Sequence, residues 1–114
     1  MTSNFIQPLD HARPRDEKPF KTTFYLSERL LVGLNTLRPG QVQPLHDHAN
    51  QDKFYQVLEG EGVFTVGEVT QTCGPGELIL APAGIVHGVE NQNVALLSFL
   101  TVIAPAPNES GTHS

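Results

Sequence analysis

The stretch GELILAPAGIVHGVEN, residues 76–91, decides the fold. It predicts a buried strand at 78–81, a Pro82-Ala83-Gly84 turn and a second short strand that carries His87. Such a turn needs a fixed φ, which proline supplies, and a positive φ, which glycine accepts without strain. The β-branched residues beside the histidine suit the pleated surface of a sheet. The stretch therefore predicts two strands joined by a sharp bend, with one histidine just past it.

A second stretch, GQVQPLHDH at residues 40–48, places two histidines two positions apart. Side chains alternate along a strand, so His46 and His48 project from the same face. A single histidine on a strand is usually a structural residue. Two more histidines on one common face favour a shared site over three separate structural roles.

Together the two stretches resemble the paired motifs of the cupin superfamily. The second motif, G-x5-P-x-G-x2-H-x3-N, is matched at every position by Gly76, Pro82, Gly84, His87 and Asn91. The first motif, G-x5-H-x-H-x3,4-E-x6-G, is matched by Gly40, His46, His48 and Gly60, and its glutamate position falls on Lys53. The resemblance covers about half of the chain and implies a small barrel of antiparallel strands.

The resemblance also implies a metal centre. His46 and His48 supply two ligands from one strand, and His87 supplies a third from a strand that barrel closure brings alongside. Three histidines with an open position suit a divalent transition ion that does chemistry, with Fe, Mn, Ni and Zn all left open. The alternative is that these histidines pack or form hydrogen bonds in a barrel that has lost its metal.

The fourth ligand stays open because Lys53 stands where cupins usually have glutamate. A lysine ammonium cannot bind a metal ion. Strand parity favours Gln51, through its amide oxygen, over Asp52, which is the better ligand chemically but faces the other way. Water could complete the site instead, and all three residues could equally be loop and rim residues.

Two further side chains are assigned by their position near this site. We expect the Lys53 amine to point to solvent, to a carboxylate or over the cavity entrance, where it would pair with an anionic substrate. Tyr55 shares the parity of Lys53, so it is a candidate catalytic hydroxyl near the metal. Its alternative role is a core residue with one hydrogen bond.

The rest of the chain predicts an all-β domain. Residues 1–19 form a polar, proline-broken N-terminal arm, 20–103 the barrel and 104–114 a tail of disordered composition. Strands are expected at 21–27, 29–37, 42–48, 53–58, 63–66, 68–73, 78–81 and 94–103. Short strands separated by turns at this spacing indicate a barrel or sandwich. With the resemblance, the fold class is a small double-stranded β-helix of the jelly-roll type.

Composition limits the partners and the location. The 114 residues carry a net charge of −5, which argues against a nucleic-acid or anionic-membrane partner. A single cysteine, Cys73, cannot form an internal disulfide, so we expect a reducing cytoplasm. The N-terminus lacks the basic-then-apolar pattern of a signal peptide.

The leading functional hypothesis is a metal-dependent, dioxygenase-like enzyme that acts on a small organic substrate, with isomerase or lyase chemistry as other options. The alternative is a non-catalytic small-ligand-binding or sensory protein, which the loss of the motif glutamate favours. We also expect a two-fold homodimer in which residues 20–37 pair or pack across the interface, because a barrel of this size leaves an open sheet edge.

Overall fold

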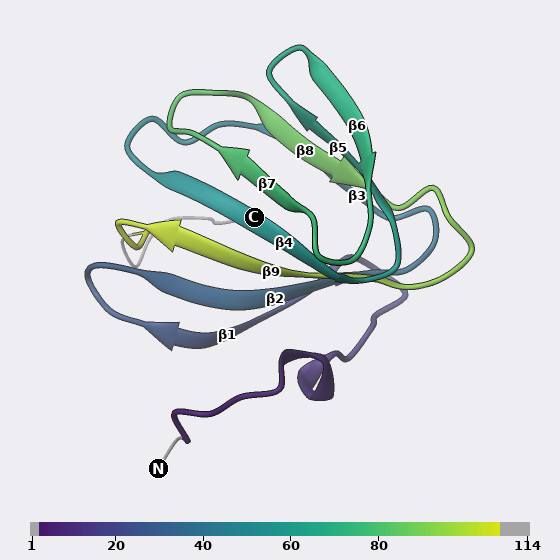
Figure 1. The fold of residues 1–114 in the computed structure, drawn as a ribbon, viewed down its shortest axis with the longest axis horizontal. Helices are drawn as coiled ribbons and strands as arrows, with labels where there is room; N and C mark the ends of the chain where they lie inside the picture. The colour runs from purple at the N-terminus through teal and green to yellow at the C-terminus, as the bar shows by residue number, and fades with distance from the viewer. Residues whose placement is uncertain (1–2, 108–114) are drawn as a thin grey trace.

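The chain folds into two antiparallel β-sheets that enclose a common interior (Figure 1). The structure, a computed structural model, describes residues 3–107. One sheet has the strand order β1-β2-β9-β4-β7 and the other the order β3-β8-β5-β6. The elements are η1 (Pro8–His11), β1 (Phe20–Leu26), β2 (Leu31–Leu37), β3 (Val42–His46), β4 (Asp52–Glu59), β5 (Gly62–Val66), β6 (Val69–Cys73), β7 (Leu78–Ala81), β8 (His87–Glu90) and β9 (Leu97–Ala104). The predicted all-β double-stranded β-helix is confirmed.

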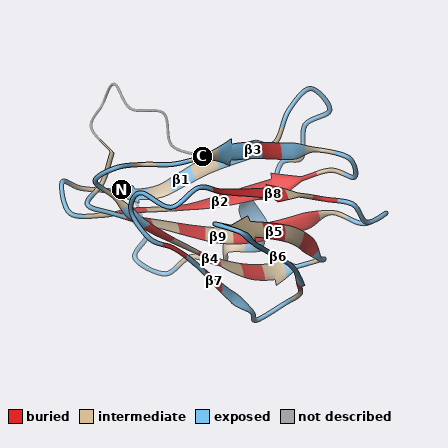
Figure 2. Cartoon of the chain, turned by 90° about the horizontal axis from the view of Figure 1, so that it is seen from above, coloured by how far each residue is buried: buried red, intermediate tan, exposed pale blue. Residues whose placement is uncertain are grey.

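Apolar side chains from both sheets form one core cluster. Strand β4 shows how it is built, because Tyr55 and Val57 alternate inward with partly exposed neighbours. The core cluster comprises Leu37, Tyr55, Val57, Phe64, Cys73, Ile79, Val89, Leu97 and Phe99. Figure 2 shows the same contrast, since β2, β8 and β9 are largely buried whereas β3 and β6 are largely exposed. The two sheets are therefore joined by apolar contacts from both inner faces.

The loop between β8 and β9 is longer than predicted. Strand β9 begins at Leu97, not at residue 94, and Val94 is 93% exposed. Asn91 explains the difference, because its Nδ2 donates hydrogen bonds to Leu37 O and Ala95 O, both at 2.9 Å. The side chain replaces strand pairing in this loop, so the apolar run starts outside the sheet.

The N-terminal arm lies against β1 and the start of β3. Gln41 Nε2 donates a hydrogen bond to Arg15 O at 2.7 Å, and Arg38 pairs with Asp16 at 2.9 Å. Farther along, the rings of His11 and Phe24 meet edge to face at 5.2 Å. Within residues 3–107, no helix has the length and hydropathy to cross a membrane. Most of the predicted tail, residues 108–114, lies outside the described residues.

Candidate metal centre

Strands β3 and β8 bring the two histidine-bearing stretches together. The strands pair antiparallel, and His46 lies opposite His87. His48 follows the end of β3, and its carbonyl accepts a hydrogen bond from Gly84 N at 2.8 Å. Gly84 has a φ of 79°, the left-handed conformation that the tight turn requires. The turn before β8 is thus fastened to the loop after β3, and all three histidines lie at one end of this strand pair.

The three imidazole rings converge. Their centroids are 4.3 Å apart for His46 and His87, 5.2 Å for His46 and His48, and 6.2 Å for His48 and His87. Because each ring contacts the other two, the structure brings together all three residues that the sequence analysis singled out as a set.

Backbone carbonyls fix the orientation of two of these rings. Nδ1 of His46 lies 2.8 Å from Pro44 O, and Nδ1 of His87 lies 3.1 Å from Ile85 O. A carbonyl can only accept, so each Nδ1 carries a proton, and in the neutral form of each ring the lone pair lies on Nε2. His87 is 2% exposed, and its Nε2 has no hydrogen-bond partner among residues 3–107. This nitrogen is therefore a buried acceptor beside two other imidazoles.

The environment also keeps His87 neutral. Burial lowers its pKa to about 4, and the hydrogen bond to Ile85 O opposes that shift only in part. The charges of Lys53 and the two other histidines lower the pKa further. At neutral pH the ring is in the form that binds metals.

The donor set fits a divalent first-row transition ion. Within the part of the chain that the structure describes, no three His, Cys, Asp or Glu side chains stand at metal-bonding geometry. Imidazole nitrogens held by carbonyls on the opposite ring atom are the usual ligands of such ions.

Lys53 lies inside the barrel, which differs from the prediction. The residue is 3% exposed, its Nζ has no hydrogen-bond partner within residues 3–107, and it lies 5.6 Å from the centroid of the Tyr55 ring. Burial, with a smaller effect of Lys21, lowers its pKa to about 7. Two of the three predicted positions of this amine, solvent and a carboxylate, are wrong, because β4 pairs Lys53 with the buried Ala81 and Ile103. The third, over the cavity entrance, stays a prediction. The motif glutamate position thus presents a buried amine.

Tyr55 is a core residue that also borders the site. It is almost fully buried, and its ring packs edge to face on Phe99 at 4.9 Å and lies 6.2 Å from the His87 ring. Burial raises the pKa of its hydroxyl well above the ordinary value. The phenol therefore stays protonated, and its ring supports the face of the site nearest the core.

Gln51 and Asp52 precede the interior part of β4. Gln51 Nε2 donates a hydrogen bond to Pro105 O at 3.3 Å, which ties its amide to the segment after β9. Asp52 is exposed, and its Oδ1 accepts a hydrogen bond from Ala83 N at 2.9 Å. The carboxylate of Asp52 therefore holds the Pro82 turn and faces away from the interior, as strand parity predicted.

Sequence reasoning missed Gln43. The residue is 3% exposed, although it lies three positions before His46 and strand parity would place it on the other face. The pairing of β3 with β8 shifts register between these two residues, with one extra residue on β3. Such a bulge lets both side chains face the interior. A proline between them, Pro44, was the available signal, since proline inside a strand often marks a bulge.

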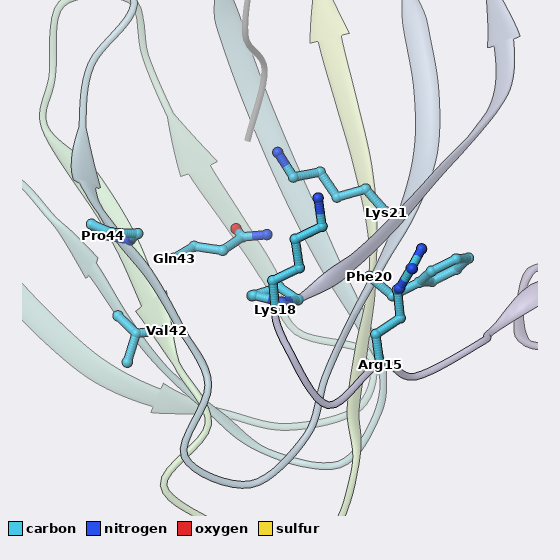
Figure 3. Close-up of a pocket in the computed structure, with 8 residues that line it drawn as sticks. Arg15, Lys18, Phe20, Lys21, Val42, Gln43 and Pro44 are labelled. Carbon is cyan, nitrogen blue, oxygen red and sulfur yellow. The ribbon is translucent and has the colours of Figure 1, made fainter.

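A pocket of about 370 Å³ opens between β3 and the arm (Figure 3). Its lining residues are Arg15, Lys18, Pro19, Phe20, Lys21, Val42, Gln43 and Pro44. Figure 3 shows the Gln43 amide extending from β3 toward Lys18 and Lys21 on the opposite wall. Sequence analysis assigned nothing to these residues.

Residues 33–103, the span that contains both motifs and the histidine cluster, match the cupin domain family. This chain is a cupin. Its fold also superposes on the crystal structure of TT1209 from Thermus thermophilus, with a TM-score of 0.84 and 44% identity over 90% of this cupin and 98% of that chain. KdgF from Halomonas sp. shares the fold at a TM-score of 0.80 but only 16% identity, over 96% and 99% of the two chains.

One relative whose name states a binding role is the oxalate-binding protein of Thermotoga maritima. It is 34% identical to this cupin over 67 residues, which are 59% of this chain and 55% of that protein. This cupin spans between 55% and 61% of the length of the three curated relatives it matches. These matches establish a cupin-type domain.

Proposed function

We propose that this cupin is a metal-dependent, dioxygenase-like enzyme that acts on a small anionic organic substrate. The observation that carries the proposal is the proximity of three imidazole rings, of which His87 has a buried Nε2 without a hydrogen-bond partner in residues 3–107, together with the buried amine of Lys53. His87 Nε2 and Lys53 Nζ both lack hydrogen-bond partners within residues 3–107. Buried polar groups without partners are rare, which supports an ion-binding or ligand-binding site here.

In this proposal the histidines hold and orient one divalent ion. His46 and His87 present Nε2 because Pro44 O and Ile85 O bind the opposite ring nitrogen. His48 completes the set from the loop that Gly84 fastens. With three neutral ligands the bound ion keeps its full positive charge and, if redox-active, supplies oxygen-activating chemistry at its open positions.

Lys53 selects the charge of the substrate in this proposal. Its Nζ is buried, lies 5.6 Å from the centroid of the Tyr55 ring and can donate up to three hydrogen bonds to an anionic oxygen. A carboxylate or enolate oxygen would supply the acceptor that the described protein groups do not. Tyr55 would bound the substrate on the core side, and Gln51 remains our candidate for a further oxygen ligand through its Oε1.

The test combines metal content with oxygen uptake. Chelator-stripped protein is reloaded separately with Fe(II), Mn(II), Ni(II) and Zn(II), and metal per chain is measured by mass spectrometry. We expect about one ion per chain, lost in the double variant His46→Ala/His48→Ala and in His87→Ala. The control His11→Ala, in the arm, should retain it. Iron-loaded protein should consume oxygen with cysteine or catechol as probe, and His87→Ala should not.

Metal retained by the double variant would contradict the metal site. Stoichiometric metal without oxygen uptake would instead favour the second candidate, a non-catalytic small-ligand-binding or sensory protein. One observation favours that candidate: Lys53 occupies the usual glutamate position, and the adjacent Asp52 carboxylate is engaged by Ala83 N. Similarity to an oxalate-binding protein also supports it. Calorimetric titration of the metal-loaded protein with oxalate separates the two.

We also propose a cytoplasmic homodimer. Strand β1 is the edge of the five-stranded sheet, and Tyr25 and Leu26 at its end are mostly exposed. An unpaired edge with exposed apolar side chains favours pairing or packing across a two-fold axis. Light scattering should give a mass near twice the 12.4 kDa of one chain. A mass near 12.4 kDa at micromolar concentration would contradict the dimer.

A further inference from the structure

We propose that the pocket between the arm and β3 is an anion-binding subsite that takes a carboxylate or phosphate group of a small organic ligand. It is lined by residues outside the histidine cluster and needs no metal. The proposal rests on the charges that gather there, on a buried amide without a partner and on the shape of the pocket.

The pocket concentrates positive charge in a chain that is negative overall. Three of the seven lysine and arginine residues line it, Arg15, Lys18 and Lys21, although the net charge is −5. Its lining within the described residues contains no acid. Arg15 lies 3.6 Å from the Glu17 carboxylate, and both side chains are more than half exposed, so that pair is weak. Like charges that lie close together repel one another, and a bound anion would offset this repulsion.

Gln43 is the second, independent observation. The residue is 3% exposed, yet neither Oε1 nor Nε2 has a hydrogen-bond partner within residues 3–107. Buried amide groups almost always have hydrogen-bond partners, and here both polar atoms of the Gln43 amide lack one within residues 3–107. A ligand would supply these partners. In Figure 3 the amide is directed at the space that Lys18 and Lys21 border. Nε2 would donate to one anionic oxygen, and Oε1 would accept from a neighbouring hydroxyl.

The shape of the pocket fits an organic molecule. Its volume of about 370 Å³ lies within the range of small-molecule sites. Phe20, Val42 and Pro44 supply apolar walls for a carbon skeleton. The arm that forms the far wall is held in place by the Gln41 bond to Arg15 O and by the Arg38–Asp16 pair. The subsite is therefore formed before the ligand arrives.

The experiment uses full-length, chelator-treated protein and two probes, succinate and inorganic phosphate. Titration is followed by NMR and calorimetry at low salt. We expect saturable binding of at least one probe, with shift changes at the Gln43 side-chain amide and at residues 15–21. Lys18→Gln should weaken binding about tenfold, the effect of one charge-assisted hydrogen bond, whereas Lys18→Arg should keep most of it. Gln43→Leu should weaken binding to a similar extent.

Two controls separate the subsite from a general effect of charge and from the metal site. Arg29→Gln removes one positive charge at the turn between β1 and β2, and it should leave binding unchanged. His87→Ala should also leave it unchanged, so this test can succeed even if the metal proposal fails. Preference for succinate or for phosphate identifies the anionic group. No saturable binding, an unmoved Gln43 amide, or an equal loss in Arg29→Gln would each overturn the subsite.

Discussion

The inner face of β4 differs between its two ends. We call the apolar end near Val57 the closed end and the polar end near Lys53 the open end. At the closed end, Val57 is packed among Phe99 and Leu97. At the open end, four residues earlier and on the same face, Lys53 is also buried but its amine has no hydrogen-bond partner within residues 3–107. One strand thus contributes apolar packing at one end and an unsatisfied polar interior at the other.

Polar groups differ between the two ends in the same way. At the closed end, the Asn91 amide donates to two carbonyls, and the Thr36 and Ser98 hydroxyls pair at 2.8 Å. At the open end, His87 Nε2 and the Gln43 amide have no partner within the described chain. We infer that apolar packing and paired polar groups at the closed end supply most of the folding free energy. The open end can then keep polar groups without protein partners, available for a ligand.

The largest expected effect is at the closed end. Phe99→Ala should lower the free energy of unfolding by about 4 kcal/mol, because it removes a fully buried ring and leaves a cavity. Urea denaturation measures this change. The matched control Phe5→Ala, at a ring that is almost fully exposed, should change stability by less than about 0.5 kcal/mol. Equal effects at the two sites would show that this end is not the stabilising core.

Asn91→Ala should destabilise the protein by about 2 kcal/mol, since it deprives two carbonyls of a buried donor. The control is Asn93→Ala, whose side chain pairs with Glu61 at an exposed position and should matter little. Denaturation midpoints give both values. A neutral Asn91 variant would mean that the loop before β9 is held by other contacts.

Lys53→Met tests the open end, and it should raise the free energy of unfolding, whereas the two preceding substitutions lower it. Replacing a buried amine by an apolar side chain of similar length should stabilise the protein by about 1 kcal/mol. Oxalate binding to the metal-loaded protein should weaken about tenfold, because the donor to the anion is lost. Lys18→Met, an exposed control, should not alter stability. Destabilisation by Lys53→Met would show that the amine is already satisfied.

The smallest effect is expected for Gln43→Leu. The substitution removes two buried polar atoms without partners in the described chain and should raise the free energy of unfolding by about 0.5 to 1 kcal/mol. Gln71→Leu, on the exposed strand β6, is the control and should be close to neutral. A loss of stability in Gln43→Leu would indicate that this amide contributes to the fold and is not held for a ligand.

The motif-bearing half of the chain was well predicted from sequence, for physical reasons. Glycines and prolines fix the turns at residues 40, 82 and 84. The two-residue spacing of His46 and His48 predicted a shared face, and the structure brings both rings near His87, although β3 ends at His46. Strand pairing then leaves little freedom for His87, which lies opposite His46. These features depend on local geometry, so they can be deduced without knowing the rest of the barrel.

Features that depend on tertiary context were missed. Gln43 was not singled out, because the bulge that lets it face the interior before His46 was not recognised. The Lys53 amine was predicted to reach solvent, a carboxylate or the cavity entrance, because burying an unpaired amine is costly. The sequence does not show whether a ligand offsets that cost. The start of β9 was predicted too early because the apolar residues from 94 onward resemble a strand. In the structure, Asn91 Nδ2 donates a hydrogen bond to Ala95 O and holds this segment in the loop. Each error concerns a residue whose surroundings come from distant parts of the chain.

The central claim, that three histidines hold one ion at the open end, is tested most directly by anomalous diffraction from a crystal of the metal-loaded protein. We predict a single strong peak about 2.0 to 2.2 Å from Nε2 of His46, His48 and His87. A peak bound by other residues, or a fully loaded crystal in which the His87 ring lies away from the ion, would contradict it.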